Sequence, residues 1–173
     1  MTPVPFFPLA AVIFGFMAVE ARRAARNERT QRTRGGLEPS GDARIYASMR
    51  ILYPGAFTLM LAELAFRASA PSLTVISLGA ATFAAAKALK WWAIATLGPC
   101  WTFRVIVVPG APLATGGPYR YLPHPNYAAV AGELIGTALM TGAILTGPVM
   151  TIVFCVLMAR RIAVERRALD AAR

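Results

Sequence analysis

The residues best suited to chemistry lie between Pro109 and Glu133. This stretch holds the only histidine of the chain, His124, within the sequence His-Pro-Asn-Tyr. Pro118 and Pro125 stop helix formation and leave backbone groups available to a ligand. The stretch then opens directly into an apolar segment that carries an acid. We therefore expect a binding site here.

A helix that starts at Asn126 is predicted to complete this site. Its side chain can cap the helix, and the unpaired N–H groups of the first turn favour a carboxylate or another anion. Glu133 follows about two turns later on the same helical stripe, and an acid inside an apolar span marks a functional site by default. The structural alternative pairs Glu133 with Arg50 or a lysine. Gly132 and Gly136 permit close approach of a neighbouring helix or a ligand.

Familiar nucleotide and metal motifs are missing from the sequence. It contains no Walker loop, GxGxxG, HExxH or paired cysteine set. One histidine without a nearby thiol or acid in the sequence is a poor metal site, so no metal is expected. The pattern also lacks the alternating strands and helices of a nucleotide-binding fold. A ligand is expected to bind to helix ends and loop backbone.

The composition places these residues in a membrane. The chain is 57% hydrophobic, and several apolar runs are long enough to cross about 30 Å of hydrocarbon. Lipid offers no partner for an open sheet edge, so the fold class is all-α, a polytopic bundle of about five transmembrane helices. The predicted spans are residues 4–19, 46–66, 73–89, 126–140 and 149–158. A charged amphipathic helix is expected over 159–172.

The arginines predict how the helices are oriented. The net charge is +10, and the arginines gather in residues 22–44 and 160–173, beside hydrophobic spans. This is the pattern of cytoplasmic segments, which places the N-terminus outside. Nucleic acid is not expected as a partner. Residues 22–44 are predicted to form a solvated loop with a helical start that contacts anionic lipids.

The third span and the long connection complete the predicted architecture. Lys87, Lys90 and Trp91 are expected at the cytoplasmic interface, where lysine heads and indole rings favour the headgroup layer. Residues 101–108 are expected along the membrane surface. Glu63 and Arg67 are four apart and can pair on one helical face. The whole chain, 1–173, is predicted to be one domain, with three spans in 1–95 and the binding loop, two spans and last helix in 96–173.

A longer motif carries a family resemblance. Residues 117–122, Gly-Pro-Tyr-Arg-Tyr-Leu, followed by His-Pro-Asn-Tyr at 124–127, resemble the signature of the isoprenylcysteine carboxyl methyltransferase family and its bacterial membrane relatives. Segments 101–112 and 161–165 are similar to the flanking pieces. The resemblance covers about residues 101–169. It implies an integral membrane enzyme that takes S-adenosylmethionine from the cytoplasm and methylates a lipophilic substrate from the bilayer.

Carried over by position, the resemblance implies the residues of the site. Glu165 is a candidate for the ribose or amino group of S-adenosylmethionine. Residues expected around the cofactor are Tyr119, His124, Pro125, Asn126, Tyr127, Arg161 and Glu165. Arg104, Arg120 or Arg50 could orient a carboxylate acceptor, whereas a phenol or enol acceptor would need a base, His124 or Glu133. Catalytic roles are therefore expected for Glu133, Arg120 and Arg104.

Other functions remain open at the level of sequence. Within the enzyme class, the acceptor could be the hydroxyl of a phenolic or polyketide lipid, or a phospholipid amine. The chain departs from the family at Pro123, where arginine is usual, and at Arg166, where a second glutamate is usual. These departures leave a non-catalytic membrane scaffold as the competing class. Membrane lipids are expected partners, and the inner membrane of a bacterium is the expected location.

Overall fold

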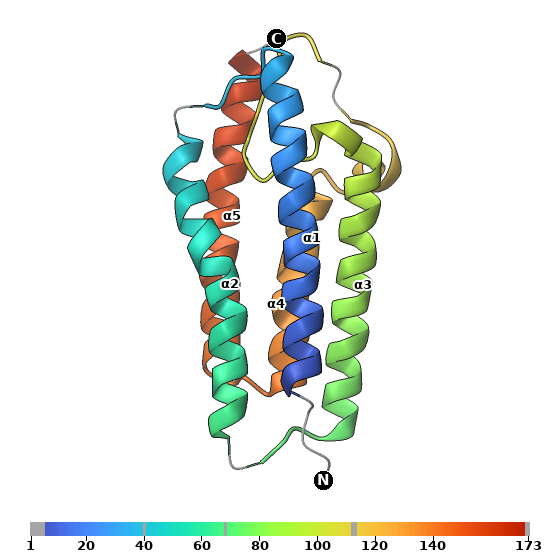
Figure 1. Ribbon diagram of the computed structural model, residues 1–173, viewed down its shortest axis with the longest axis vertical. Helices are drawn as coiled ribbons and strands as arrows, with labels where there is room; N and C mark the ends of the chain where they lie inside the picture. Colours follow the sequence, from blue (N-terminus) through green and yellow to red (C-terminus); the bar gives the residue numbers. More distant parts are fainter. Residues whose placement is uncertain (1–5, 40, 68, 112–113, 172–173) are drawn as a thin grey trace.

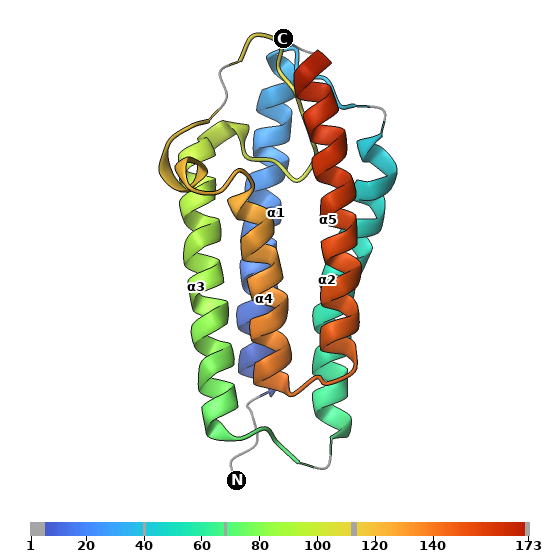
Figure 2. The ribbon, with the colours of Figure 1, turned by 180° about the vertical axis from the view of Figure 1, so that it is seen from behind.

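The computed structural model describes residues 6–39, 41–67, 69–111 and 114–171. Within them the fold is all-α and contains no strand, as predicted. Five long helices lie side by side, and successive helices run in opposite directions (Figures 1 and 2). They are α1 (Phe6–Thr33), α2 (Asp42–Phe66), α3 (Leu73–Leu97), α4 (Pro125–Thr141) and α5 (Thr146–Ala171), with 3-10 turns η1 (Gly98–Cys100) and η2 (Gly117–Arg120) between α3 and α4.

Three segments of the bundle are long and apolar enough to cross a membrane: Asp42–Phe66, Leu73–Cys100 and Thr146–Asp170. The protein is therefore an integral membrane protein. Helix α4 has 17 residues, which at 1.5 Å per residue gives about 25 Å, close to the hydrocarbon thickness. It packs most extensively against α3 and also contacts α5 and α2, an arrangement consistent with the predicted count of about five.

The helices are longer than the predicted spans. Helix α1 continues to Thr33, so the helical start predicted for the arginine-rich residues 22–44 is present and reaches about the middle of that segment. It extends this far because residues 16–34 contain neither glycine nor proline and are rich in good helix formers. Helix α3 likewise continues to Leu97. Helix α5 runs without a break through the predicted boundary near residue 158. The predicted ends at residues 4 and 172 lie outside the described residues.

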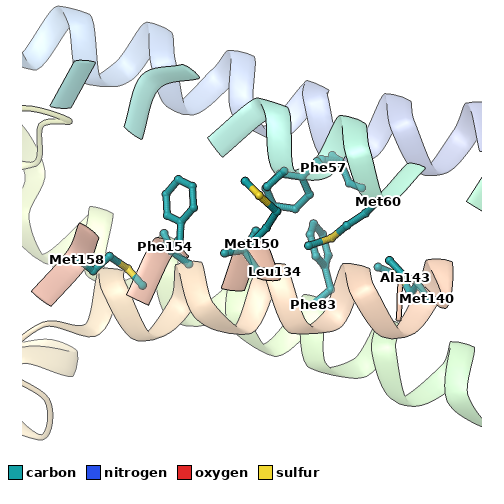
Figure 3. Packing of buried hydrophobic residues seen from close by; sticks show 12 residues of the cluster. Phe57, Met60, Phe83, Leu134, Met140, Ala143, Met150, Phe154 and Met158 are labelled. Atoms are coloured by element: carbon teal, nitrogen blue, oxygen red, sulfur yellow. The ribbon is translucent and has the colours of Figure 1, made fainter. Parts of the chain in front are cut away.

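Small residues bring α3 and α4 into close contact. A Cβ added to Gly136 would lie 2.7 Å from the backbone nitrogen of Phe83, and one added to Gly79 would lie 2.7 Å from the carbonyl oxygen of Gly136. The predicted close approach of a neighbouring helix at Gly136 is thus confirmed. Next to this contact, side chains of all five helices form an apolar core (Figure 3).

Glu63 and Arg67 contact the short connection between α4 and α5, which lies at the end of the bundle opposite the arginine-rich segments. The Glu63 carboxylate accepts hydrogen bonds from the backbone N–H groups of Leu145, at 3.2 Å, and Thr146, at 2.9 Å. Arg67 donates to the carbonyl of Gly142. The prediction that Glu63 and Arg67 pair is wrong, because the start of α5 offers the carboxylate unpaired N–H donors.

Candidate functional site

A cavity of about 620 Å³ lies inside the arginine-rich end of the bundle. All five helices and the connection between α3 and α4 contribute residues to its wall. This end holds the C-terminus and the long connection (Figure 1). The volume is within the range of about 300–1,000 Å³ that is usual for small-molecule sites.

The residues expected around the cofactor all line this cavity. They come from η2, from the start of α4 and from the second half of α5. The full set is Tyr119, His124, Pro125, Asn126, Tyr127, Arg161 and Glu165. Two sequence segments separated by most of α4 and the first half of α5 therefore meet at one cavity.

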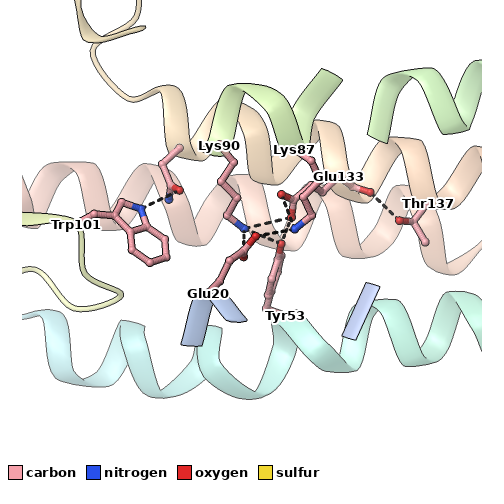
Figure 4. Close-up of polar contacts among 8 residues, drawn as sticks. Glu20, Tyr53, Lys87, Lys90, Trp101, Glu133 and Thr137 are labelled. Atoms are coloured by element: carbon pink, nitrogen blue, oxygen red, sulfur yellow. Dashed lines mark hydrogen bonds and ion pairs between the residues drawn. The ribbon is translucent and has the colours of Figure 1, made fainter. Parts of the chain in front are cut away.

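The start of α4 differs from the prediction. The helix begins at Pro125, which suits the first helical position. Asn126 does not cap it, so that prediction is wrong. Its Oδ1 instead accepts a hydrogen bond of 3.4 Å from Nε1 of Trp101 (Figure 4). The carbonyl of Trp101 also accepts a bond of 2.7 Å from Asn27 of α1, so Asn126 helps to tie the connection to the bundle.

Glu165 lies beside two aromatic rings. The rings of His124 and Tyr127 are stacked with their centroids 5.4 Å apart. Glu165 Oε2 is 3.8 Å from His124 Nδ1 and 3.5 Å from the hydroxyl of Tyr127. These contacts are long and leave the carboxylate with spare capacity to accept hydrogen bonds. Burial and the charge of Glu165 raise the pKa of Tyr119 to about 12, so its hydroxyl stays protonated and can donate.

Arg161 builds the wall of the cavity. Its Nε is 3.4 Å from Asp42 Oδ1, and its guanidinium also donates to the carbonyl of Phe103. The other oxygen of Asp42 accepts a bond of 2.8 Å from the N–H of Val105. Because this pair and the buried Trp101 draw the connection into the bundle, the prediction that residues 101–108 lie along the membrane surface is wrong.

The three arginines considered for a carboxylate acceptor are placed differently. Arg104 lines the cavity, but its guanidinium is 2.6 Å from Glu38 and 3.7 Å from Glu28. Arg120 is exposed on η2 and is not among the residues of the cavity wall. Arg50 is exposed and lines the cavity from α2. Of the three, Arg50 is the one best placed to meet a ligand.

A buried cluster of two acids and two lysines lies at the inner end of the cavity (Figure 4). Lys87 Nζ is 2.8 Å from Glu20 and 3.0 Å from Glu133. Lys90 Nζ is 2.7 Å from Glu20 and 3.3 Å from Glu133. Lys87 is 6% exposed and Lys90 2%, so the prediction that both lie at the membrane interface is wrong.

Tyr53 of α2 joins this cluster. Its hydroxyl donates to Glu133 and accepts a bond of 3.2 Å from Lys90 Nζ. Glu133 is fully buried and does not line the cavity, whereas Glu20, Tyr53 and Lys90 do. The geometry at Glu133 thus matches the structural alternative of pairing with a lysine. The overlooked signal was the three-residue spacing of Lys87 and Lys90, which puts both on one face of an apolar helix.

The fold and the cavity define a polytopic all-α membrane protein with an internal cavity. Residues 77–171 match the model of the isoprenylcysteine carboxyl methyltransferase (ICMT) family. The chain is also 32% identical over 166 residues to the uncharacterized protein YpbQ of Bacillus subtilis (strain 168), a match that covers 95% of this chain and 96% of that protein. No solved structure matches. The chain belongs to the isoprenylcysteine carboxyl methyltransferase family, whose members are membrane methyltransferases that generally use S-adenosylmethionine.

Proposed function

We propose that this protein transfers a methyl group from S-adenosylmethionine to a lipophilic acceptor at the membrane. The observation that carries this proposal is the convergence of residues 119–127 and 161–165 on one cavity. The cofactor would bind near the connection between α3 and α4, and the acceptor would bind deeper in the bundle. Because all five helices line the cavity, we also propose that residues 1–173 act as one domain.

The residues near the connection have the chemistry that the cofactor requires. The Glu165 carboxylate can accept from ribose hydroxyls or the adenine amino group. The rings of His124 and Tyr127 offer a flat aromatic surface for adenine. The N-terminus of α4 favours the carboxylate of the methionine part. When bound, S-adenosylmethionine supplies a methyl group made electrophilic by its sulfonium, so the protein mainly has to align the acceptor and exclude water.

The deeper part of the cavity suits a lipophilic acceptor. Its wall includes the apolar side chains of Met17, Pro54 and Phe154. Ala21 of α1 and Arg50 of α2 both line the cavity and are exposed on the bundle. An acceptor would therefore enter from the bilayer between α1 and α2. The family supports an isoprenylcysteine carboxylate as acceptor, while the buried cluster favours a hydroxyl, as argued below.

The same proposal includes an orientation in the membrane. The cavity lies at the end of the bundle that holds the arginine-rich parts of both α1 and α5 (Figure 1). Under the positive-inside rule this end faces the cytoplasm, where S-adenosylmethionine is made. The protein would then lie in the inner membrane of a bacterium, with its N-terminus on the side away from the cytoplasm.

Calorimetric titration with S-adenosylhomocysteine, the product form of the cofactor, tests the proposed site. The purified protein should bind it saturably, and Glu165→Gln should weaken binding by about 10- to 150-fold, because hydrogen bonds to a charged group contribute about 1.5–3 kcal/mol. Arg160→Gln is the matched control, since Arg160 is exposed on the same helix and does not line the cavity. Absence of binding, or equal affinities of the two variants, would refute the site.

A further inference from the structure

Three ionisable side chains of the cavity wall lie away from the proposed cofactor residues. They are Glu20 of α1, Tyr53 of α2 and Lys90 of α3. All three belong to the buried cluster (Figure 4). Along α4, the cluster residue Glu133 lies nine residues beyond His124, a rise of about 13 Å. The cluster therefore lies at the deep end, where the acceptor is proposed to bind.

The charges of the cluster are balanced. Two glutamates face two lysines at distances of 2.7–3.3 Å. A carboxylate acceptor placed beside them would bring a further negative charge into an apolar interior, which is costly unless a cation is added. An acceptor with a neutral hydroxyl brings no such charge. The balance therefore favours a hydroxyl over a carboxylate at this end.

The two glutamates differ in their remaining capacity to accept a hydrogen bond from a ligand in the cavity. Glu133 is outside the cavity wall, and it already contacts Lys87, Lys90 and the hydroxyl of Tyr53. Glu20 lines the cavity and contacts the two lysines. An ionised carboxylate has about four lone-pair sites. Glu20 thus keeps capacity for a hydrogen bond from a group inside the cavity.

We propose that Glu20 is the general base for an acceptor whose reacting group is an acidic hydroxyl, a phenol or enol, on a lipophilic body. This inference rests on the proposed function. The acceptor O–H bond breaks and its proton moves to the Glu20 carboxylate. The oxygen forms a bond to the methyl carbon, and the electron pair of the broken C–S bond stays on sulfur. Lys90 faces the oxygen and stabilises its negative charge.

The test compares two double variants that remove the same number of charges. Glu20→Gln with Lys87→Met removes the proposed base and keeps the cluster neutral. Glu133→Gln with Lys87→Met is also neutral but keeps Glu20 opposite Lys90. Methyl transfer from labelled S-adenosylmethionine to 4-dodecylphenol is measured, and turnover is divided by the number of S-adenosylhomocysteine sites. Protein that has not folded is then not counted.

The variant without Glu20 should turn over 4-dodecylphenol about 10²–10⁴ times more slowly than the variant that keeps it, the usual contribution of a general base. With a nitro-substituted dodecylphenol, which ionises without help near neutral pH, the difference should shrink strongly. Equal rates of the two variants, or the same ratio for both phenols, would overturn the role of Glu20.

A second acceptor tests the proposed substrate class with the unchanged protein. N-acetyl-S-farnesylcysteine presents a carboxylate on a lipophilic body and should be a poorer acceptor than 4-dodecylphenol, which is neutral near pH 7. Its preferential methylation, lost in Arg50→Gln, would overturn the hydroxyl class and place Arg50 on a carboxylate. Failure of the wild-type protein to bind S-adenosylhomocysteine would instead refute the underlying methyltransferase proposal, so the two failures are distinguishable.

Discussion

Removal of the Lys87 charge should be among the most destabilising single changes in this protein. Lys87→Met removes the cation that lies 2.8 Å from Glu20 and 3.0 Å from Glu133. Two buried carboxylates are then left with Lys90 alone. Removal of one partner from a buried ion pair costs about 3–5 kcal/mol. At 1.36 kcal/mol per factor of ten, the folding equilibrium constant should fall by about 150- to 5,000-fold.

A second change separates charge imbalance from lost packing. Glu133→Gln added to Lys87→Met restores equal numbers of acids and lysines, so the double variant should recover most of the lost free energy of unfolding. Reversible unfolding of detergent-solubilised protein measures both variants. The reasoning is refuted if Lys87→Met unfolds like the wild type. It is equally refuted if the double variant is no more stable than the single one.

Other predictions concern packing, protonation and orientation. Gly136→Ala should lower the free energy of unfolding by about 1–3 kcal/mol through overpacking against α3, whereas Gly55→Ala, where a Cβ meets open space, should not. The raised pKa of Tyr119, about 12, means that the folded protein favours the protonated hydroxyl. Its contribution to the free energy of unfolding is therefore complete below pH 10 and is lost as the pH rises through 12. The affinity for S-adenosylhomocysteine should therefore keep the same pH dependence in Tyr119→Phe up to pH 10, in calorimetric titrations. In a variant without native cysteines, a cysteine at Gly35 should be labelled from inside and one at Ala70 from outside; the reverse would contradict the orientation.

Local signals in the sequence predicted the helices and the start of the site. Runs of apolar residues identified the bundle, and the prolines at 118 and 125 marked the irregular connection before α4. Helix ends were predicted less well. The charges of the arginine-rich residues after Val19 predict a loop with only a helical start, yet these residues have high helix propensity and contain no breaker before Gly35.

The buried polar contacts could not be predicted from sequence. Lys87 and Lys90 carry the same local signal as interfacial lysines, and their partner Glu20 is far away in the chain. The ion pair of Asp42 and Arg161 also joins two helices, α2 and α5, that are far apart in the sequence. Such contacts depend on which faces of the helices pack together. The hydrophobic runs in the sequence locate the helices but do not predict this packing. The convergence of residues 119–127 and 161–165 on one cavity was implied by the family resemblance, whereas local sequence patterns alone did not predict it.

Transfer of a labelled methyl group into a lipid tests the central proposal most directly. Purified protein is incubated with methyl-labelled S-adenosylmethionine and a lipid extract of bacterial membranes, and the label is counted in the organic phase. The wild-type protein should place label in a lipophilic product, and Glu165→Gln should reduce it at limiting S-adenosylmethionine. An organic phase without label, or the same label with both proteins, would contradict a methyltransferase that works through this cavity.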